Sequence, residues 1–87
     1  MRTIETSTAF RRDYKKHGFL DERLIKVLYK LLNDEALPQK YRDHNLIGDW
    51  EGYRECHLAP DLLLIYKQTE NNQLCLARLG SHSSLFG

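Results

Sequence analysis

Residues 52–68, GYRECHLAPDLLLIYKQ, predict two antiparallel strands joined by a tight turn. The strands are expected over Gly52–Leu58 and Leu62–Gln68, where aliphatic and aromatic residues gather between polar segments. Residues 59–61, APD, favour a type I turn, which accepts proline and then aspartate at its central positions. A third antiparallel strand is expected over Leu74–Ser81, after a polar segment that tolerates a turn.

The residues before this hairpin predict a short strand and a basic helix. The strand is expected over Arg2–Thr6. Ser7 or Thr8 can cap a helix over Ala9–His17, and Gly18 is its expected stop.

A second helix is expected after Asp21, which suits an N-cap position. Its apolar residues recur at helical spacing and form one stripe, made of Leu24, Val27, Leu28, Leu31 and Leu32. This stripe predicts packing against the sheet. The polar segment 39–49 has no periodicity and predicts a long ordered loop.

These elements predict an α+β fold in the order β-α-α-β-β-β, with two N-terminal helices packed on a mainly antiparallel sheet. Residues 1–87 are expected to form one domain. The longest apolar run, Leu62–Tyr66, is far below the roughly 20 residues of a membrane span, and the N-terminus lacks a secretory pattern. We therefore expect a cytoplasmic protein without a membrane partner, in which Cys56 and Cys75 are reduced thiols.

The net charge of +1 gives by itself no reason to propose a nucleic-acid partner. The densest basic cluster lies on the first expected helix and consists of Arg11, Arg12, Lys15 and Lys16. Such a cluster is either a solvated helix face or an RNA-binding stripe.

Five polar residues at loop or strand ends are candidates for chemistry: His44, His57, Asp61, Arg78 and His82. Arg78 and His82 are four residues apart, so alternation along the expected last strand places both on one face. His57 and Asp61 join them if the strand over Gly52–Leu58 neighbours the last strand across the middle one.

These residue types can cut an RNA backbone by attack of the 2′-hydroxyl group, which needs a base, an acid and a cation. Imidazole serves as acid or base near neutral pH, and arginine matches phosphate oxygens. Trp50 and Phe86 can stack on bases. On local grounds each candidate also has an ordinary structural role. A histidine can bond the backbone, Asp61 can form the turn, Arg78 can be a surface cation, and the two aromatic residues can be packing anchors.

Residues 43–87 contain several spaced motifs: DHNL at 43–46, GDWEGYRECH at 48–57, PD at 60–61, LLIY at 63–66, RLGSH at 78–82 and LFG at 85–87. In this order they resemble the YafQ-type toxins of the RelE/ParE superfamily. The resemblance implies a ribosome-dependent mRNA endonuclease that needs no metal or other cofactor. It also implies two kinds of partner, the 70S ribosome with its mRNA and a cognate antitoxin, an acidic protein of the DinJ/RelB type.

The resemblance also implies roles for individual residues. Those forming the active site are His44, His57, Asp61 and His82, supported by Arg78 and Phe86. Separately from the resemblance, we expect Trp50, Arg54 and the basic helix residues Arg11, Arg12, Lys15 and Lys16 to contact RNA. Leu62 departs from the family pattern, in which an aromatic residue follows the aspartate, so any base stacking there moves to Trp50 or Phe86.

Two alternatives belong to other classes. The same superfamily includes ParE-like toxins thought to bind DNA gyrase without catalysis. A zinc site with His44, His57, Asp61 and His82 as ligands is the other, although their spacing matches no common short zinc motif.

Overall fold

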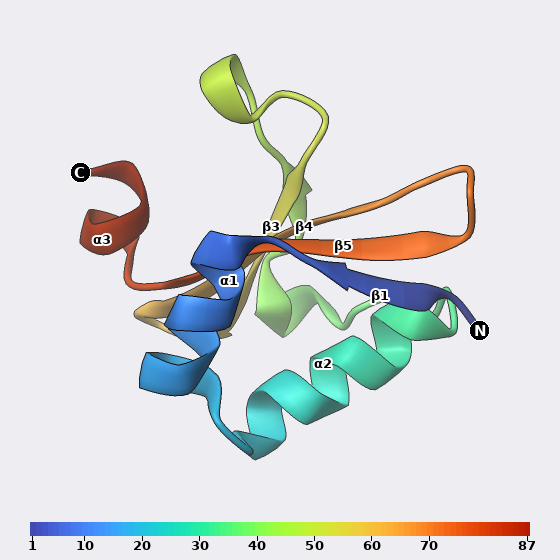
Figure 1. The fold of residues 1–87 in the computed structure, drawn as a ribbon, viewed down its shortest axis with the longest axis horizontal. Coiled ribbons are helices and arrows are strands. Elements are labelled where there is room, and N and C mark those ends of the chain that lie inside the picture. The colour runs from blue at the N-terminus through green and yellow to red at the C-terminus, as the bar shows by residue number, and fades with distance from the viewer.

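A five-stranded mixed sheet in the order β1-β5-β4-β3-β2 organises the structure, a computed structural model that describes residues 1–87. The strands are β1 (Thr3–Thr6), β2 (His44–Asn45), β3 (Arg54–Ala59), β4 (Leu62–Gln68) and β5 (Gln73–Gly80). Strand β4 lies in the centre, and β1 and β2 form the edges (Figure 1). The α+β class and the mainly antiparallel sheet are therefore confirmed.

Strands β3 and β4 form the predicted hairpin. Ala59 pairs with Leu62, so Pro60 and Asp61 are the two residues of the turn. Strand β5 is antiparallel to β4, as predicted. Strand β1 runs parallel to β5, and this pairing joins the N-terminus to the C-terminal half of the chain.

Two helical segments follow β1. Helix α1 (Thr8–Asp13) continues into a π-helical turn, η1 (Tyr14–Gly18), and α2 (Glu22–Leu32) comes next. Ser7 is the N-cap of α1, because its Oγ accepts a hydrogen bond from Phe10 N–H at 2.8 Å. No helix combines the length and the apolar character that crossing a membrane requires.

Gly18 ends the first helical segment, as predicted. Glycine is required at this position because the chain packs closely against neighbouring side chains. A β-carbon at this position would lie 2.6 Å from Leu79 Cδ2 and 3.0 Å from Leu24 Cδ2. Both leucines are completely buried. Glycine thus lets η1 approach β5 more closely than any other residue would allow.

The predicted element order lacks four short elements. Strand β2 lies in the segment predicted to be a loop, together with two 3₁₀ turns, η2 (Gln39–Tyr41) and η3 (Gly48–Trp50). Helix α3 (His82–Phe86) forms the C-terminus. Each has too few residues to produce a periodic pattern, so the sequence alone did not indicate them.

The start of α3 corrects the predicted end of the last strand. Ser81 is the N-cap of α3, with Oγ accepting from Ser84 N–H at 3.1 Å, and β5 ends at Gly80. The prediction that Arg78 and His82 share a strand face is therefore wrong, because the chain leaves the sheet between them.

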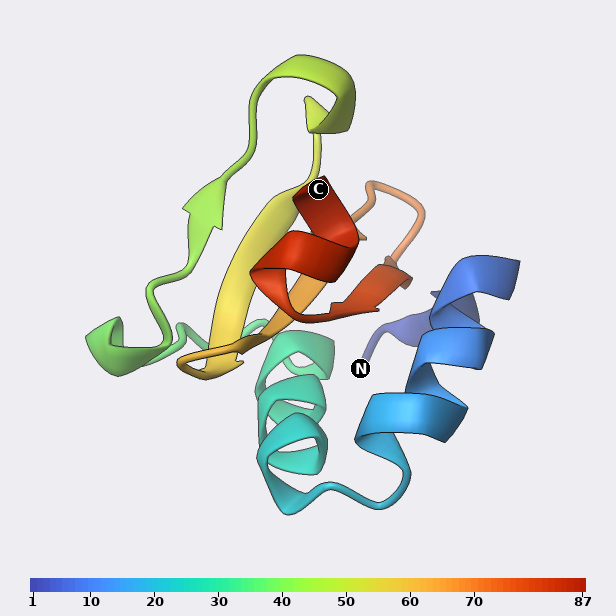
Figure 2. The same ribbon diagram turned by 90° about the vertical axis from the view of Figure 1, so that its left-hand side faces the viewer.

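Apolar side chains cover both faces of the sheet. The larger core packs α1 and α2 on one face and contains 12 buried residues, among them Leu24 and Leu64. The smaller core packs α3 on the other face and consists of Leu63, Ile65 and Leu85. Figure 2 shows α3 in front of the strands, away from α1 and α2.

Both cysteines are free thiols, as predicted. Cys56 belongs to the larger core, and burial raises the pKa of its thiol to about 12. This thiol therefore stays protonated and unreactive at neutral pH.

Asp21 is the N-cap of α2, as predicted. Its carboxylate also forms an ion pair with the side chain of Arg23. Its carboxylate accepts hydrogen bonds from the backbone N–H groups of Arg23 and Leu24. The Arg23 guanidinium lies 2.8 Å from Asp21 Oδ2. The side-chain hydrogen bond from Arg23, with the backbone bonds, lowers the pKa of Asp21 to about 2.

We expect Asp21→Ala to lower the free energy of unfolding at neutral pH by about 1 kcal/mol, the usual value of a lost N-cap. Asp21→Asn keeps an acceptor oxygen and should cost less. Because the pKa of Asp21 is depressed in the folded state, its charge stabilises the fold at neutral pH, and this contribution is lost as pH falls from about 4 towards 2. The stability difference between the parent and Asp21→Asn should therefore shrink over that range in urea unfolding. A constant difference would contradict this assignment.

Candidate active site

His44 and His57 flank the carboxylate of Glu55. His57 Nε2 lies 3.1 Å from Glu55 Oε1, and His44 Nε2 lies 3.9 Å from the same oxygen. The two imidazole centroids are 6.5 Å apart. Strand pairing creates this arrangement, because His44 is directly opposite Glu55 and His57 follows Glu55 by two positions on β3.

The neighbouring oxygen atoms favour one tautomer of each imidazole. His44 Nδ1 lies 2.7 Å from the backbone carbonyl oxygen of Arg42, and a carbonyl only accepts, so Nδ1–H is the donor. Neutral His44 consequently has a free lone pair on Nε2. His57 Nε2 lies near a carboxylate oxygen, which only accepts, so the neutral ring favours its proton on Nε2 and its lone pair on Nδ1.

Glu55 is the one charged side chain in the buried class, with 5% of its surface exposed. A buried carboxylate needs compensating partners, and the His57 imidazole, at 3.1 Å, is nearer to it than His44, at 3.9 Å. Sequence analysis did not identify Glu55 as a site residue. The available signal was its position two residues before His57 on a strand, which puts both on one face.

A polar network on the opposite face of the sheet fixes the short strand that carries His44. Asp43 binds Arg54 Nη2 at 3.0 Å and accepts a hydrogen bond from the Tyr66 hydroxyl at 2.6 Å. Arg54 Nη1 donates to Asn45 Oδ1 at 2.7 Å. Because side chains alternate, anchoring the residues on both sides of His44 directs His44 towards Glu55. Arg54, expected to contact RNA, is thus occupied on the face away from the histidines.

Asp61 and His82 form a second pair. Asp61, in the β3–β4 turn, accepts a hydrogen bond from the backbone N–H of His82 at 3.3 Å. The His82 ring lies 5.0 Å from the Phe86 ring, one helical turn later in α3. Both Asp61 and His82 are exposed to solvent.

The strand register places the pair of Glu55 and His57 at the same end of the sheet as the pair of Asp61 and His82. His57 on β3 is opposite Leu63 on β4, and Leu63 is opposite Gly80, the last residue of β5. Leu63 belongs to the core beneath α3, so His57 lies on the α3 side of the sheet. The predicted order, with β4 between β3 and β5, is confirmed, and four of the candidate residues gather at one end of one face.

Arg78 is held by a residue of α1. Its Nε lies 2.7 Å from Asp13 Oδ2, and Nη2 lies 3.3 Å from Oδ1. Asp13 also accepts from Leu79 N–H at 3.0 Å. Burial raises the pKa of Asp13, but the hydrogen bonds from Arg78 and Leu79 outweigh it and lower this pKa overall. Asp13 therefore stays ionised and fixes the guanidinium at the edge of β5.

The other expected RNA contacts are Trp50 and the basic cluster on the first helix. Trp50, in η3, stands edge-on to Tyr53 at 5.2 Å and packs against the smaller core. The basic cluster predicted on the first helix (Arg11, Arg12, Lys15 and Lys16) occupies the exposed side of α1 and η1. None of these four lines the pocket next to His57.

No three histidine, cysteine, aspartate or glutamate side chains form a group that can hold a metal ion. The four ligands of the zinc alternative (His44, His57, Asp61 and His82) therefore do not make a preformed tetrahedral site, for which four donors must converge.

Comparison with known proteins places this geometry in a family. The model of the family described as "Bacterial toxin of type II toxin-antitoxin system, YafQ" matches residues 2–87. The mRNA interferase toxin YafQ of Escherichia coli strain K12 is 42% identical over 90 residues, which cover 99% of this chain and 97% of the relative.

Two solved structures have the same fold. A metal-bound toxin from Helicobacter pylori is 50% identical with a TM-score of 0.88, over 99% of this chain and 100% of that chain. YafQ in the E. coli DinJ–YafQ complex is 38% identical with a TM-score of 0.85, over 100% of both chains. A family match over nearly the whole chain, with relatives above 30% identity, leaves one conclusion: this protein belongs to the YafQ family of bacterial toxins of type II toxin–antitoxin systems.

Proposed function

We propose that this protein is an mRNA interferase that acts in the cytoplasm, where it cuts messenger RNA on the 70S ribosome. One observation carries the proposal: the His57 imidazole beside the Glu55 carboxylate, and His82 with its backbone N–H bonded to Asp61, lie at the same end of the sheet. Acid–base cleavage of a phosphodiester needs this combination of groups. The relative named mRNA interferase toxin YafQ supports it further.

In the proposed reaction a base removes the proton of the ribose 2′-hydroxyl, and the oxygen attacks the adjacent phosphorus. The bond to the 5′-oxygen breaks while an acid protonates that oxygen, which leaves a 2′,3′-cyclic phosphate and a free 5′-hydroxyl. His82 and Asp61 supply the acid–base pair, and His44 and His57 assist. Arg78 stabilises the charge of the pentacoordinate phosphate through the guanidinium N–H groups that Asp13 does not occupy.

Glu55 acts as a positioning residue in this scheme. Its carboxylate lies 3.1 Å from His57 Nε2 and stabilises the imidazolium that forms when His57 takes up a proton. The buried position strengthens this interaction, since water does not screen it. His44, held from its other nitrogen by the Arg42 carbonyl, completes the cluster.

The second proposed partner is a cognate antitoxin, an acidic protein of the DinJ/RelB type. The relative crystallised as a DinJ–YafQ complex supports this partner. Exposed apolar residues offer surface for such contact, among them Ile4 at 45% and Phe19 at 69% exposure. Burial of apolar surface usually supplies most of the affinity between proteins.

We expect His82→Gln and Asp61→Asn each to lower the single-turnover cleavage rate on programmed ribosomes by about 10² to 10⁴, the usual contribution of a positioned acid or base. The matched control is His17→Gln, because His17 lies in η1 away from this face, and it should cleave like the parent. Mapping the 3′ ends of a reporter mRNA gives the rate. Growth inhibition that survives both substitutions would show a binding toxin of the ParE kind and overturn the proposal.

Glu55→Gln should lower the cleavage rate at saturating ribosome by between about 10- and 10⁴-fold, because loss of the carboxylate behind a catalytic imidazole has cost up to that factor elsewhere. The ribosome concentration at half-maximal rate should not change, since Glu55 is buried and out of reach of RNA. Glu51→Gln, an exposed change in the neighbouring loop, is the control. Equal rates for both variants would remove Glu55 from the mechanism.

Treating the toxin with a chelator should leave its activity unchanged, because side chains perform every proposed proton transfer. The toxin is incubated with EDTA and separated from it by gel filtration before it meets ribosomes, whose own magnesium stays intact. A metal-bound relative makes this test informative. Loss of cleavage that a divalent ion restores would show that a metal takes part.

A further inference from the structure

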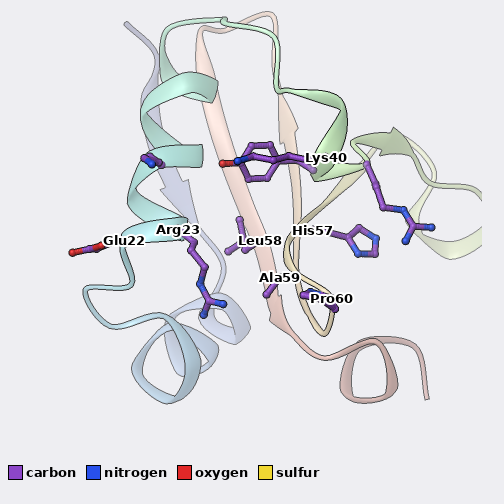
Figure 3. A pocket seen from close by; sticks show the side chains of 10 residues that line it. Glu22, Arg23, Lys40, His57, Leu58, Ala59 and Pro60 are labelled. Carbon is purple, nitrogen blue, oxygen red and sulfur yellow. The ribbon is translucent and has the colours of Figure 1, made fainter.

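A basic groove lies next to the histidine cluster and shares one wall with it. The groove has a volume of about 520 Å³ and is lined by Arg23 and Lys26 from α2, by Lys40 and Arg42 around η2, and by the end of β3. His57 is one of the lining residues (Figure 3). The groove thus extends from α2 to an imidazole of the histidine cluster.

Most of the positive charge in this groove is uncompensated. Lys26, Lys40 and Arg42 form no ion pair, whereas Arg23 pairs with Asp21. Glu22 is the one acidic side chain in the lining. Lys40 Nζ lies 5.3 Å from the centre of the ring of the buried Tyr41, and Lys40 itself is exposed to solvent. The local charge is strongly positive although the whole chain carries only +1.

Arg42 connects the groove to the active site mechanically. Its backbone has φ 52, in the left-handed region, which turns the chain between η2 and β2. Its carbonyl oxygen accepts the 2.7 Å hydrogen bond from His44 Nδ1, while its side chain lines the groove. One residue therefore fixes an imidazole of the site and adds a cation beside it.

We propose that this groove binds the phosphate backbone of the substrate RNA strand next to the phosphate that is cut, with Lys26, Lys40 and Arg42 as the contacts. The inference rests on the proposed function, because it takes the strand to be the substrate of the histidine cluster. Cations on flexible stems along an open channel suit a chain of phosphates, and continuity with His57 favours the strand being cut over an acidic protein segment. The groove then takes the role that sequence analysis gave to the cluster on the first helix.

The test measures binding without cleavage. A labelled single strand of about 12 nucleotides, fully 2′-O-methylated so that it has no nucleophile, is titrated with the full-length toxin between about 20 and 200 mM salt. Each phosphate contact adds about 0.7 to the slope of log affinity against log salt for single strands. The variant Lys26→Gln/Lys40→Gln/Arg42→Asn should therefore lose about 2 from this slope. Asparagine is chosen at position 42 because it tolerates the left-handed backbone.

Two matched variants control the test. Arg12→Gln/Lys15→Gln/Lys16→Gln removes the same charge from the first helical segment and should keep the parent slope. Lys26→Arg/Lys40→Arg/Arg42→Lys keeps the groove charge and should also keep the parent slope, which separates the effect of charge from an effect on folding.

A slope that falls equally for both neutralised variants, or for neither, would overturn the proposal, as would failure of the parent to bind at low salt. Tighter binding of a polyglutamate peptide than of RNA would assign the groove to a protein partner and also overturn it. If the proposed function itself is wrong, the parent toxin leaves mRNA intact in the cleavage measurement, which is separate from this binding test.

Discussion

Strand β4 buries side chains on both of its faces, and this double burial fixes the sheet. Leu63 and Ile65 pack under α3, while Leu64 and Tyr66 pack against the larger core, and none of the four is more than 1% exposed. Each such side chain contributes about 1.5 to 3 kcal/mol by burial. A slip of one residue would exchange the two faces and leave both cores mismatched. The strand therefore accepts a single register with β3 and with β5.

This register decides where the chemistry can occur. Because β3 cannot slide along β4, Glu55 and His57 stay on the face that carries α3. The β4–β5 register likewise fixes where the chain leaves the sheet, and so where His82 begins its helix. The site is thus built at the rim of a rigid sheet rather than on independent loops.

Carboxylates then orient the functional groups one by one. Glu55 holds His57, Asp61 holds the backbone at His82, and Asp13 holds Arg78. The pairs of Glu55 with His57 and of Asp13 with Arg78 are partly buried and less screened than surface ion pairs, and loss of one partner leaves the other group without compensation. The uncompensated cations of the groove differ from these groups, because nothing in the protein satisfies them, and that leaves them available to a ligand.

The sequence by itself determined the elements that repeat over several residues: the hairpin of β3 and β4, the strand β5, and helix α2 with its cap at Asp21. It also indicated the three histidines, because their residue type limits the chemistry. Tertiary structure decided the rest: the two-residue strand β2, the turn of helix α3, the burial of Glu55 between two imidazoles, and the pairing of Arg78 with Asp13. The physical reason is the separation, along the sequence, of the residues that interact. Periodicity and capping are encoded within a few neighbouring residues, whereas Arg78 and Asp13 are 65 positions apart and meet only because β5 packs beside α1.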